Sequence, residues 1–158
     1  MGIDQRLADL GCRLPQPAAP VVAAYAPAIV ANGLLYVSGQ LPFHDGSLMV
    51  GRCGEDRDEH YGRKAAERCG LMLLAQIKMA LGSLDRVERI VKLGVFVSST
   101  PSFTAQSKVA NGASELMQAV FDEAGRHARS AVGVPVLPLG AIAEVDAVVA
   151  VRDSTAGA

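Results

Sequence analysis

The sequence of this 158-residue chain predicts a single α+β domain in which two helices cover one face of a β-sheet. Short runs rich in β-branched residues predict the strands, and two longer segments with apolar residues every three or four positions predict the helices. Half of the residues are hydrophobic, which is typical of a globular chain rather than a disordered one. The predicted order is two strands, a short strand, a helix, a strand, a helix and two strands.

The first third of the chain predicts a small antiparallel unit. Asn32-Gly33 lies between two apolar runs, which is the strongest short-range signal for a hairpin, and Asp45-Gly46 marks a second turn. The predicted segments are, in order, a helix over 3–11, an extended stretch over 13–27 and strands over 28–30 and 34–38.

The two predicted helices lie in the middle of the chain. The first begins at Asp56 or Asp58 and runs to Leu81, where Gly82 is a natural C-terminal stop. The second runs over 104–124 and carries one apolar stripe. The remaining predicted strands cover 90–98, 129–134 and 141–151. The predicted domain therefore has a lead-in over 1–24, a core over 25–152 and a frayed tail over 153–158.

The last predicted strand carries apolar residues on both of its faces. Helices are expected to cover one of these faces, so the other needs cover from a second subunit. The sequence therefore predicts self-association, without fixing the number of subunits.

Charge and composition exclude several classes of protein. A net charge of -1 and an aromatic content of 4% argue against a nucleic-acid-binding surface, which needs basic residues and stacking rings. Three widely spaced cysteines without a CxxC pattern predict reduced thiols in a cytoplasmic protein and no metal site. We find no signal-peptide pattern and no apolar run of membrane-spanning length. No metal or organic cofactor is expected.

The strongest functional signal lies in the range 129–147. Arg129 opens one predicted strand, Glu144 lies in the next, and no charged side chain stands between them. A charge in an apolar setting is costly unless it is paired or faces a polar pocket. A guanidinium in such a pocket binds a ligand carboxylate, and a carboxylate there can activate a water. A buried or interfacial Arg129–Glu144 ion pair with no chemistry explains the same residues, and these residues alone slightly favour it.

Two neighbouring residues remain open to more than one interpretation. Asp146 shares a strand face with Glu144, so it is a second acid of the pocket, an acid at the axis between subunits, or a competing partner for Arg129. His127 titrates near neutrality, and we interpret it as a rim residue rather than a catalyst.

Four segments stand in a characteristic order, and they are NGLLYVSGQLP at 32–42, VKLGVFVS at 91–98, Arg129-Ser130 and AEVDAVVAV at 143–151. Together they resemble the RidA or YjgF family of reactive enamine/imine deaminases, long described as L-PSP endoribonucleases. The resemblance covers roughly residues 25–151, and within the family this chain is similar to a less studied branch. It implies a chorismate-mutase-like sandwich with a mixed sheet and two helices on one face, assembled as a homotrimer with a barrel-like centre.

The resemblance also implies a pocket between subunits and a role for each of its residues. Arg129 would grip the substrate carboxylate, and Glu144 would position or activate a water. Tyr25 would line the pocket, and Asn111 matches a polar helix residue near it.

Two residues that follow Arg129 also matter, Ser130 for its backbone groups and Ala131 because it differs from the family pattern. Backbone groups of Ser130 and Ala131 are suited to hold the amino or imino group of the substrate. Ala131 stands where the family often has a cysteine, so a thiol has no role at this position. The residues around Tyr25 also differ from the commoner family pattern, which predicts a reshaped pocket.

The reaction that the resemblance implies is hydrolysis of a 2-enamino or 2-imino acid, such as 2-aminoacrylate, to a 2-keto acid and ammonia. One alternative is a trimer that binds small carboxylates or partner proteins without turnover. A second alternative is the endoribonuclease of the older family description, against which the near-neutral charge argues.

Overall fold

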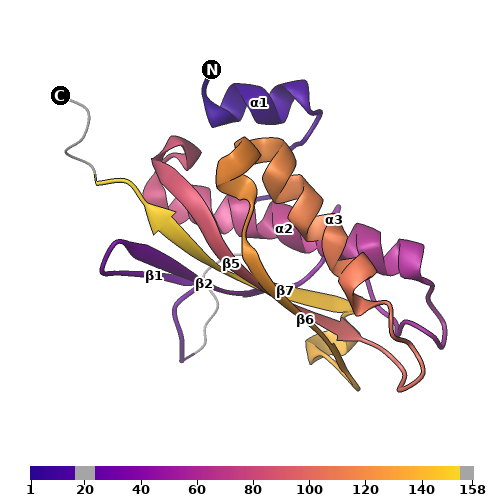
Figure 1. The fold of residues 1–158 in the computed structure, drawn as a ribbon. Coiled ribbons are helices and arrows are strands. Elements are labelled where there is room, and N and C mark those ends of the chain that lie inside the picture. The colour runs from indigo at the N-terminus through magenta and orange to yellow at the C-terminus, as the bar shows by residue number, and fades with distance from the viewer. Residues whose placement is uncertain (17–23, 154–158) are drawn as a thin grey trace.

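The computed structural model describes residues 1–16 and 24–153, in which helices lie on one side of a five-stranded sheet (Figure 1). Three short 3-10 turns complete the fold at 84–86, 122–125 and 138–140. No helix in the described ranges combines the length and hydropathy that a membrane crossing requires. The elements are α1 (Ile3–Asp9), β1 (Ala28–Ala31), β2 (Leu34–Gln40), β3 (Phe43–His44), β4 (Ser47–Leu48), α2 (Glu59–Leu81), β5 (Val87–Ser98), α3 (Gln106–Phe121), β6 (Ala128–Val134) and β7 (Ala143–Val151).

Both predicted turns are confirmed. Asn32 and Gly33 have φ angles of 51° and 74°, and they join β1 to β2. Asp45 and Gly46 have φ angles of 49° and 79°, and they join β3 to β4. Asparagine, aspartate and glycine tolerate this left-handed conformation better than other residues, so these sequences select tight hairpins.

The two long helices also form where the sequence predicts them. Asp58 caps α2 by accepting a hydrogen bond from the Tyr61 N–H at 2.8 Å, and Gly82 ends the helix at a φ of 80°. Helix α3 is shorter than predicted, because Asp122 adopts a φ of 52° and the chain tightens into a 3-10 turn through 125. The predicted extended stretch over 13–27 and the tail lie partly outside the described residues.

The sheet is mixed, in the order β1–β2–β7–β5–β6. Strands β1, β2, β7 and β5 pair antiparallel, and β6 lies parallel to β5 at one edge. Strand β5 begins at Val87, three residues before the predicted start. Strand β7 begins at Ala143 rather than 141, because the chain makes a 3-10 turn at 138–140 before it enters the sheet.

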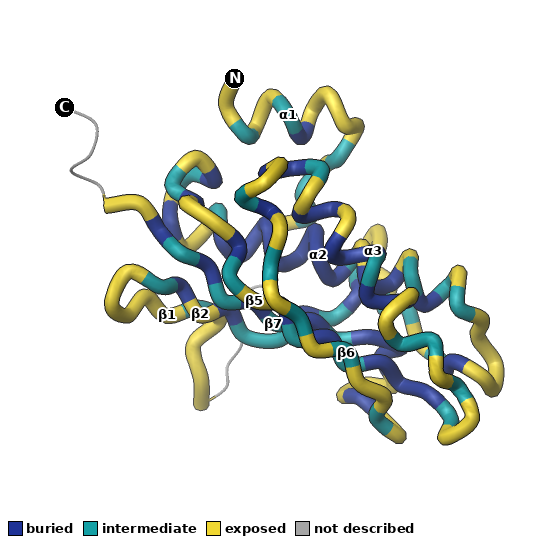
Figure 2. The backbone as a smooth tube through the Cα atoms, viewed as in Figure 1, coloured by how far each residue is buried: buried dark blue, intermediate teal, exposed yellow. Residues whose placement is uncertain are grey.

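Helices α2 and α3 cover one face of the sheet, and the main core lies between these two layers (Figures 1 and 2). Along β7, odd-numbered residues are buried against the helices and even-numbered residues are only half-buried. We call the second side the open face, because none of the described helices covers it. Exposed or half-exposed apolar side chains lie on it: Ile29, Tyr36, Phe96, Val132 and Val148.

Candidate functional site

Arg129 lies on the helix-covered face of the sheet. Its strand partner on β5 is Leu93, which is fully buried in the core, and directly paired residues share a face. The guanidinium therefore reaches α3 rather than the open face. Its Nη1 donates hydrogen bonds to Asn111 Oδ1 at 2.8 Å and to Ser114 Oγ at 3.0 Å. Its Nη2 donates to the Ser107 carbonyl oxygen at 3.3 Å.

These contacts fix the guanidinium and leave part of it available. Three of its five N–H donors are used by α3, so Nε and one N–H of Nη2 remain for a ligand. Two donors on one planar group suit a carboxylate. The sequence singled out Asn111 but missed Ser107 and Ser114. Their spacing could have revealed them: Ser107 lies four residues before Asn111 and Ser114 three residues after it, which places all three on one helical face.

His127 extends this network by one hydrogen bond. Its Nδ1 lies 2.6 Å from the Gly125 carbonyl oxygen, which can only accept, so Nδ1 carries the proton. In the neutral ring, Nε2 then accepts from the Ser114 hydroxyl at 2.9 Å, and Ser114 Oγ accepts from Arg129. Burial lowers the pKa of His127, and the neighbouring Arg129 lowers it further. His127 thus orients the hydroxyl that holds Arg129.

This arrangement predicts that His127 makes the protein less stable in mild acid. The ring is favoured as the neutral form in the fold, so its contribution is complete above the unfolded pKa of about 6.5. It is lost as the pH falls through the lower folded pKa. We expect the free energy of unfolding of the wild type, relative to that of His127→Gln, to fall between pH 7 and pH 5 in urea titrations. A difference that stays constant over this range would contradict the lowered pKa of His127.

Glu144 lies on the open face, in register with Phe96 of β5. Its carboxylate rests against the backbone of Gly39 in β2, where any Cβ would overlap it. The pairing of β2 and β7 shifts register between Val37 and Gln40, next to this contact. Burial raises the pKa of Glu144, and the neighbouring charge of Asp146 raises it further.

Asp146 lies on the same face as Glu144, as the sequence predicts. Its Oδ1 accepts a hydrogen bond from the Gly94 N–H at 3.1 Å, and its side chain leans over that glycine. Burial raises the pKa of Asp146, while the Gly94 N–H and the charge of Lys92 act against this shift. The alternative that Asp146 competes for Arg129 is wrong within the chain, because the two side chains leave opposite faces of the sheet.

The alternative of an Arg129–Glu144 ion pair within the chain is also wrong. The two side chains leave opposite faces of the sheet, and β5 lies between their strands, a separation of roughly 10 Å at ordinary strand spacing. In the described part of the chain, Arg129 forms no ion pair with any carboxylate. Strand alternation along β7 places Glu144, but the sequence alone does not show which face Arg129 takes.

The other predicted site residues lie beside these two. Tyr25 is 57% exposed and lines a cavity with Gly39. The Ser38 hydroxyl donates to the Ala26 carbonyl oxygen at 2.8 Å and so ties the Tyr25 segment to β2. Ala131 is half-buried on the same face as Arg129, and Ser130 is exposed on the open face.

The predicted site residues and the side chains that contact them therefore form two groups. We call the first the arginine cluster, which comprises Asn111, Ser114, His127 and Arg129 at the β6 edge. We call the second the glutamate cluster, which comprises Tyr25, Gly39 and Glu144 at β2 and β7. Strand β5 separates the two clusters in the sheet.

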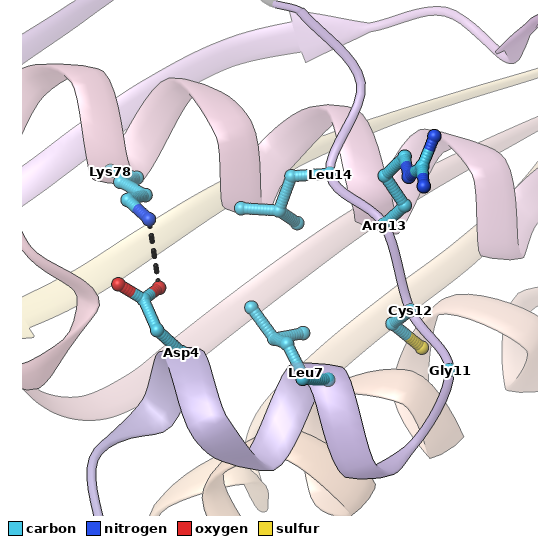
Figure 3. Close-up of a pocket in the computed structure, with 8 residues that line it drawn as sticks. Asp4, Leu7, Gly11, Cys12, Arg13, Leu14 and Lys78 are labelled. Atoms are coloured by element: carbon cyan, nitrogen blue, oxygen red, sulfur yellow. Dashed lines mark hydrogen bonds and ion pairs between the residues drawn. The ribbon is translucent and has the colours of Figure 1, made fainter.

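A further cavity of about 550 Å³ lies between α1, the segment that follows it and α2 (Figure 3). Lys78 Nζ donates to Asp4 Oδ1 at 2.8 Å across it, and Leu7 and Leu14 form part of its wall. None of the predicted site residues is among the described residues that line this cavity, so it is separate from both clusters.

Comparisons with known proteins point to one family. A family model described as YjgF/chorismate mutase-like, putative endoribonuclease, matches residues 4–150. Protein TCP17 of Trypanosoma cruzi is 52% identical over 145 residues, which cover 90% of each chain. The crystal structure of Atu1372 from Agrobacterium tumefaciens is 45% identical, covers 95% of this chain and 92% of its own, and has a TM-score of 0.88. RidA from an Antarctic Psychrobacter is 28% identical, with coverages of 86% and 94% and a TM-score of 0.59.

Proposed function

Because this chain belongs to the YjgF/chorismate-mutase-like family, which includes RidA, we propose that it hydrolyses reactive 2-enamino and 2-imino acids to 2-keto acids and ammonia. The observation that carries the proposal is the Arg129 guanidinium, which α3 holds in place with two N–H donors left for a carboxylate. The reaction needs such an anchor, a positioned water and a route for protons.

Glu144 is suited to the second and third of these needs. An enamine first tautomerises to its imine, R–C(=NH)–COO⁻. Water then adds to the imine carbon and ammonia leaves, so that C=N is replaced by C=O. A carboxylate can take a proton from the attacking water and return it to the departing nitrogen. A raised pKa suits this exchange, since Glu144 then holds a proton nearer to neutral pH than an ordinary glutamate.

Two clusters on opposite faces of the sheet cannot close on one small substrate within a single subunit. We therefore place the site between subunits, with the arginine cluster of one subunit facing the glutamate cluster of the next. The apolar side chains of the open face favour such an assembly, because a patch of this kind rarely stays exposed. The assembly that we propose is the family's homotrimer, in which the open faces form a barrel-like centre.

The proposal is tested by supplying the substrate as it forms. A serine dehydratase generates 2-aminoacrylate in solution, and the release of pyruvate is followed with and without the protein. We expect the protein to accelerate pyruvate release in proportion to its concentration. No acceleration by folded, assembled protein would contradict the proposed function.

Gly39 provides a prediction about the position of Glu144. In Gly39→Ala the new methyl group would overlap the Glu144 carboxylate and force it to move. Moving a reacting group by about 1 Å typically costs about 100-fold in rate. We expect kcat/KM for imine hydrolysis to fall by about ten- to 100-fold while the protein stays folded.

Gly94→Ala is the matched control for this variant. Its methyl group would push aside the Asp146 side chain, which lies on the same face of the sheet as Glu144. The variant therefore repeats the steric change beside the Asp146 carboxylate instead of the Glu144 carboxylate. We expect a clearly smaller loss of kcat/KM. Equal losses in the two variants would show that general disturbance of the face, and not the position of Glu144, limits the rate.

A further inference from the structure

A cavity of about 130 Å³ lies behind Tyr25, between α2 and the end of β2. Its walls are mostly apolar, but two carboxamides also line it. The residues that matter here are Tyr25, Gly39, Gln40, Phe43, Met72 and Gln76.

Gln76 is the unusual member of this lining. It lies within α2, and only 6% of its surface is exposed. Burying a carboxamide without a hydrogen-bond partner costs about 1–3 kcal/mol, so such groups are nearly always paired. Within the described residues, the Gln76 side chain forms no hydrogen bond, and its amide atoms are not sealed off from the cavity. It is therefore a buried polar group that a ligand can satisfy.

Gln40 adds a second polar group. Its Nε2 donates to the Ser38 carbonyl oxygen at 3.0 Å, which fixes the amide and leaves Oε1 as an acceptor. The two glutamines thus offer both donors and acceptors. None of the described lining residues is charged, so a carboxylate or ammonium group placed there would lose its hydration without gaining a counter-ion.

The cavity lies on the α2 side of the sheet and meets the glutamate cluster around the sheet edge at the end of β2, beyond the last β1–β2 pair. Tyr25 and Gly39 line it, and the Gly39 backbone also packs against the Glu144 carboxylate. A water occupies about 30 Å³ in the liquid, so the cavity accommodates a group of roughly four heavy atoms. This is the size of a short amino-acid side chain that extends from a substrate held at the cluster.

We propose that this cavity binds the side chain of the substrate and selects 2-imino acids whose side chain ends in a neutral hydrogen-bonding group, above all a carboxamide. This inference rests on the proposed function, because it assumes that the reacting carbon lies at the glutamate cluster. A substrate carboxamide would pair with Gln76 and Gln40, while its methylene group packs against Phe43 and Met72.

Three 2-keto acids of nearly equal shape test the inference by binding alone. They are 2-oxosuccinamate, which ends in a carboxamide, 4-methyl-2-oxopentanoate, which ends in two methyl groups, and oxaloacetate, which ends in a carboxylate. We expect titration calorimetry to give a Kd for 2-oxosuccinamate at least about tenfold below the other two, as one or two buried hydrogen bonds would produce. Equal affinities for the three would overturn the inference.

Gln76→Met removes the carboxamide and keeps the length of the side chain. We expect this variant to lose the preference for 2-oxosuccinamate and to bind pyruvate as the wild type does, since pyruvate has no side chain to fill the cavity. The matched control is Gln118→Met, the same change at an exposed position on α3, which should keep the preference. A preference that survives in Gln76→Met would also overturn the inference.

These outcomes separate the inference from the proposed function. If the protein hydrolyses the imine of pyruvate but binds the three keto acids equally, the function stands and the cavity has no selective role. If it binds 2-oxosuccinamate selectively but accelerates no imine hydrolysis, the cavity is a selective binding site and the proposed catalysis is wrong.

Discussion

Arg129→Ala is expected to lower kcat/KM for imine hydrolysis by at least about 100-fold, mainly through a higher KM. The substitution removes two charge-assisted hydrogen bonds to the substrate carboxylate, each worth about 1.5–3 kcal/mol. It removes no carboxylate partner within the chain, because the described contacts of Arg129 are to neutral groups of α3. The fold is therefore expected to tolerate the change. Pyruvate release from 2-aminoacrylate, measured over a range of substrate supply, gives both constants.

Two further variants control this experiment. Arg126→Ala removes an exposed arginine from the same connection between α3 and β6, where its one ion pair within residues 1–16 and 24–153 is with Glu123 at 3.7 Å, and it should leave turnover unchanged. Arg129→Lys keeps the charge but loses the planar pair of donors, so it should recover only a small part of the activity. Full activity in Arg129→Ala would show that the carboxylate anchor lies elsewhere.

Glu144→Gln is expected to lower kcat by about 100-fold or more, with little change in KM. The amide keeps the size of the side chain but cannot take a proton from water, and general base catalysis typically contributes about 10²–10⁴-fold. In the wild type, activity should fall as the pH drops through the raised pKa of Glu144, because the protonated acid no longer activates water. This acidic limb of the pH–rate profile should be absent from the residual activity of Glu144→Gln.

The same variant should be more stable than the wild type at neutral pH. A carboxyl group whose pKa is raised in the fold stabilises the protein fully only below its unfolded pKa, and that contribution is lost as the pH rises through the folded pKa. Glu144→Gln removes this cost, so its Tm should exceed that of the wild type at pH 7 and approach it near pH 4 when both are compared as unassembled subunits, in which no neighbour's arginine cluster faces Glu144. An unchanged or lower Tm at pH 7 would contradict the assigned environment of Glu144.

The sequence predicted those parts of the fold that local chemistry determines. Asn32-Gly33 and Asp45-Gly46 form their hairpins because few other residues adopt positive φ, and Asp58 and Gly82 mark the ends of α2. The alternation along β7 correctly placed Glu144 and Asp146 on one face, because side-chain direction along a strand depends only on residue parity.

The arrangement around Arg129 could not be predicted in this way. Its face depends on the parallel pairing of β6 with β5, which is a contact between distant segments and leaves no local pattern. For the same reason the sequence did not connect Ser114 to His127 and Arg129, although the helical spacing of Asn111 and Ser114 was visible. The structural ion pair between Arg129 and Glu144 is excluded within one subunit once their faces are known, whereas an ion pair between subunits stays an alternative.

The central claim is that one substrate is held between the arginine cluster of one subunit and the glutamate cluster of its neighbour. Mixing the inactive variants Arg129→Ala and Glu144→Gln tests it most directly, after the subunits are co-expressed or unfolded and reassembled together. Each variant supplies the cluster that the other lacks, so random mixing should restore about a quarter of the pockets in a closed ring, and with them about a quarter of the wild-type activity. Mixed assemblies that remain as inactive as the two parents would contradict a site shared between subunits.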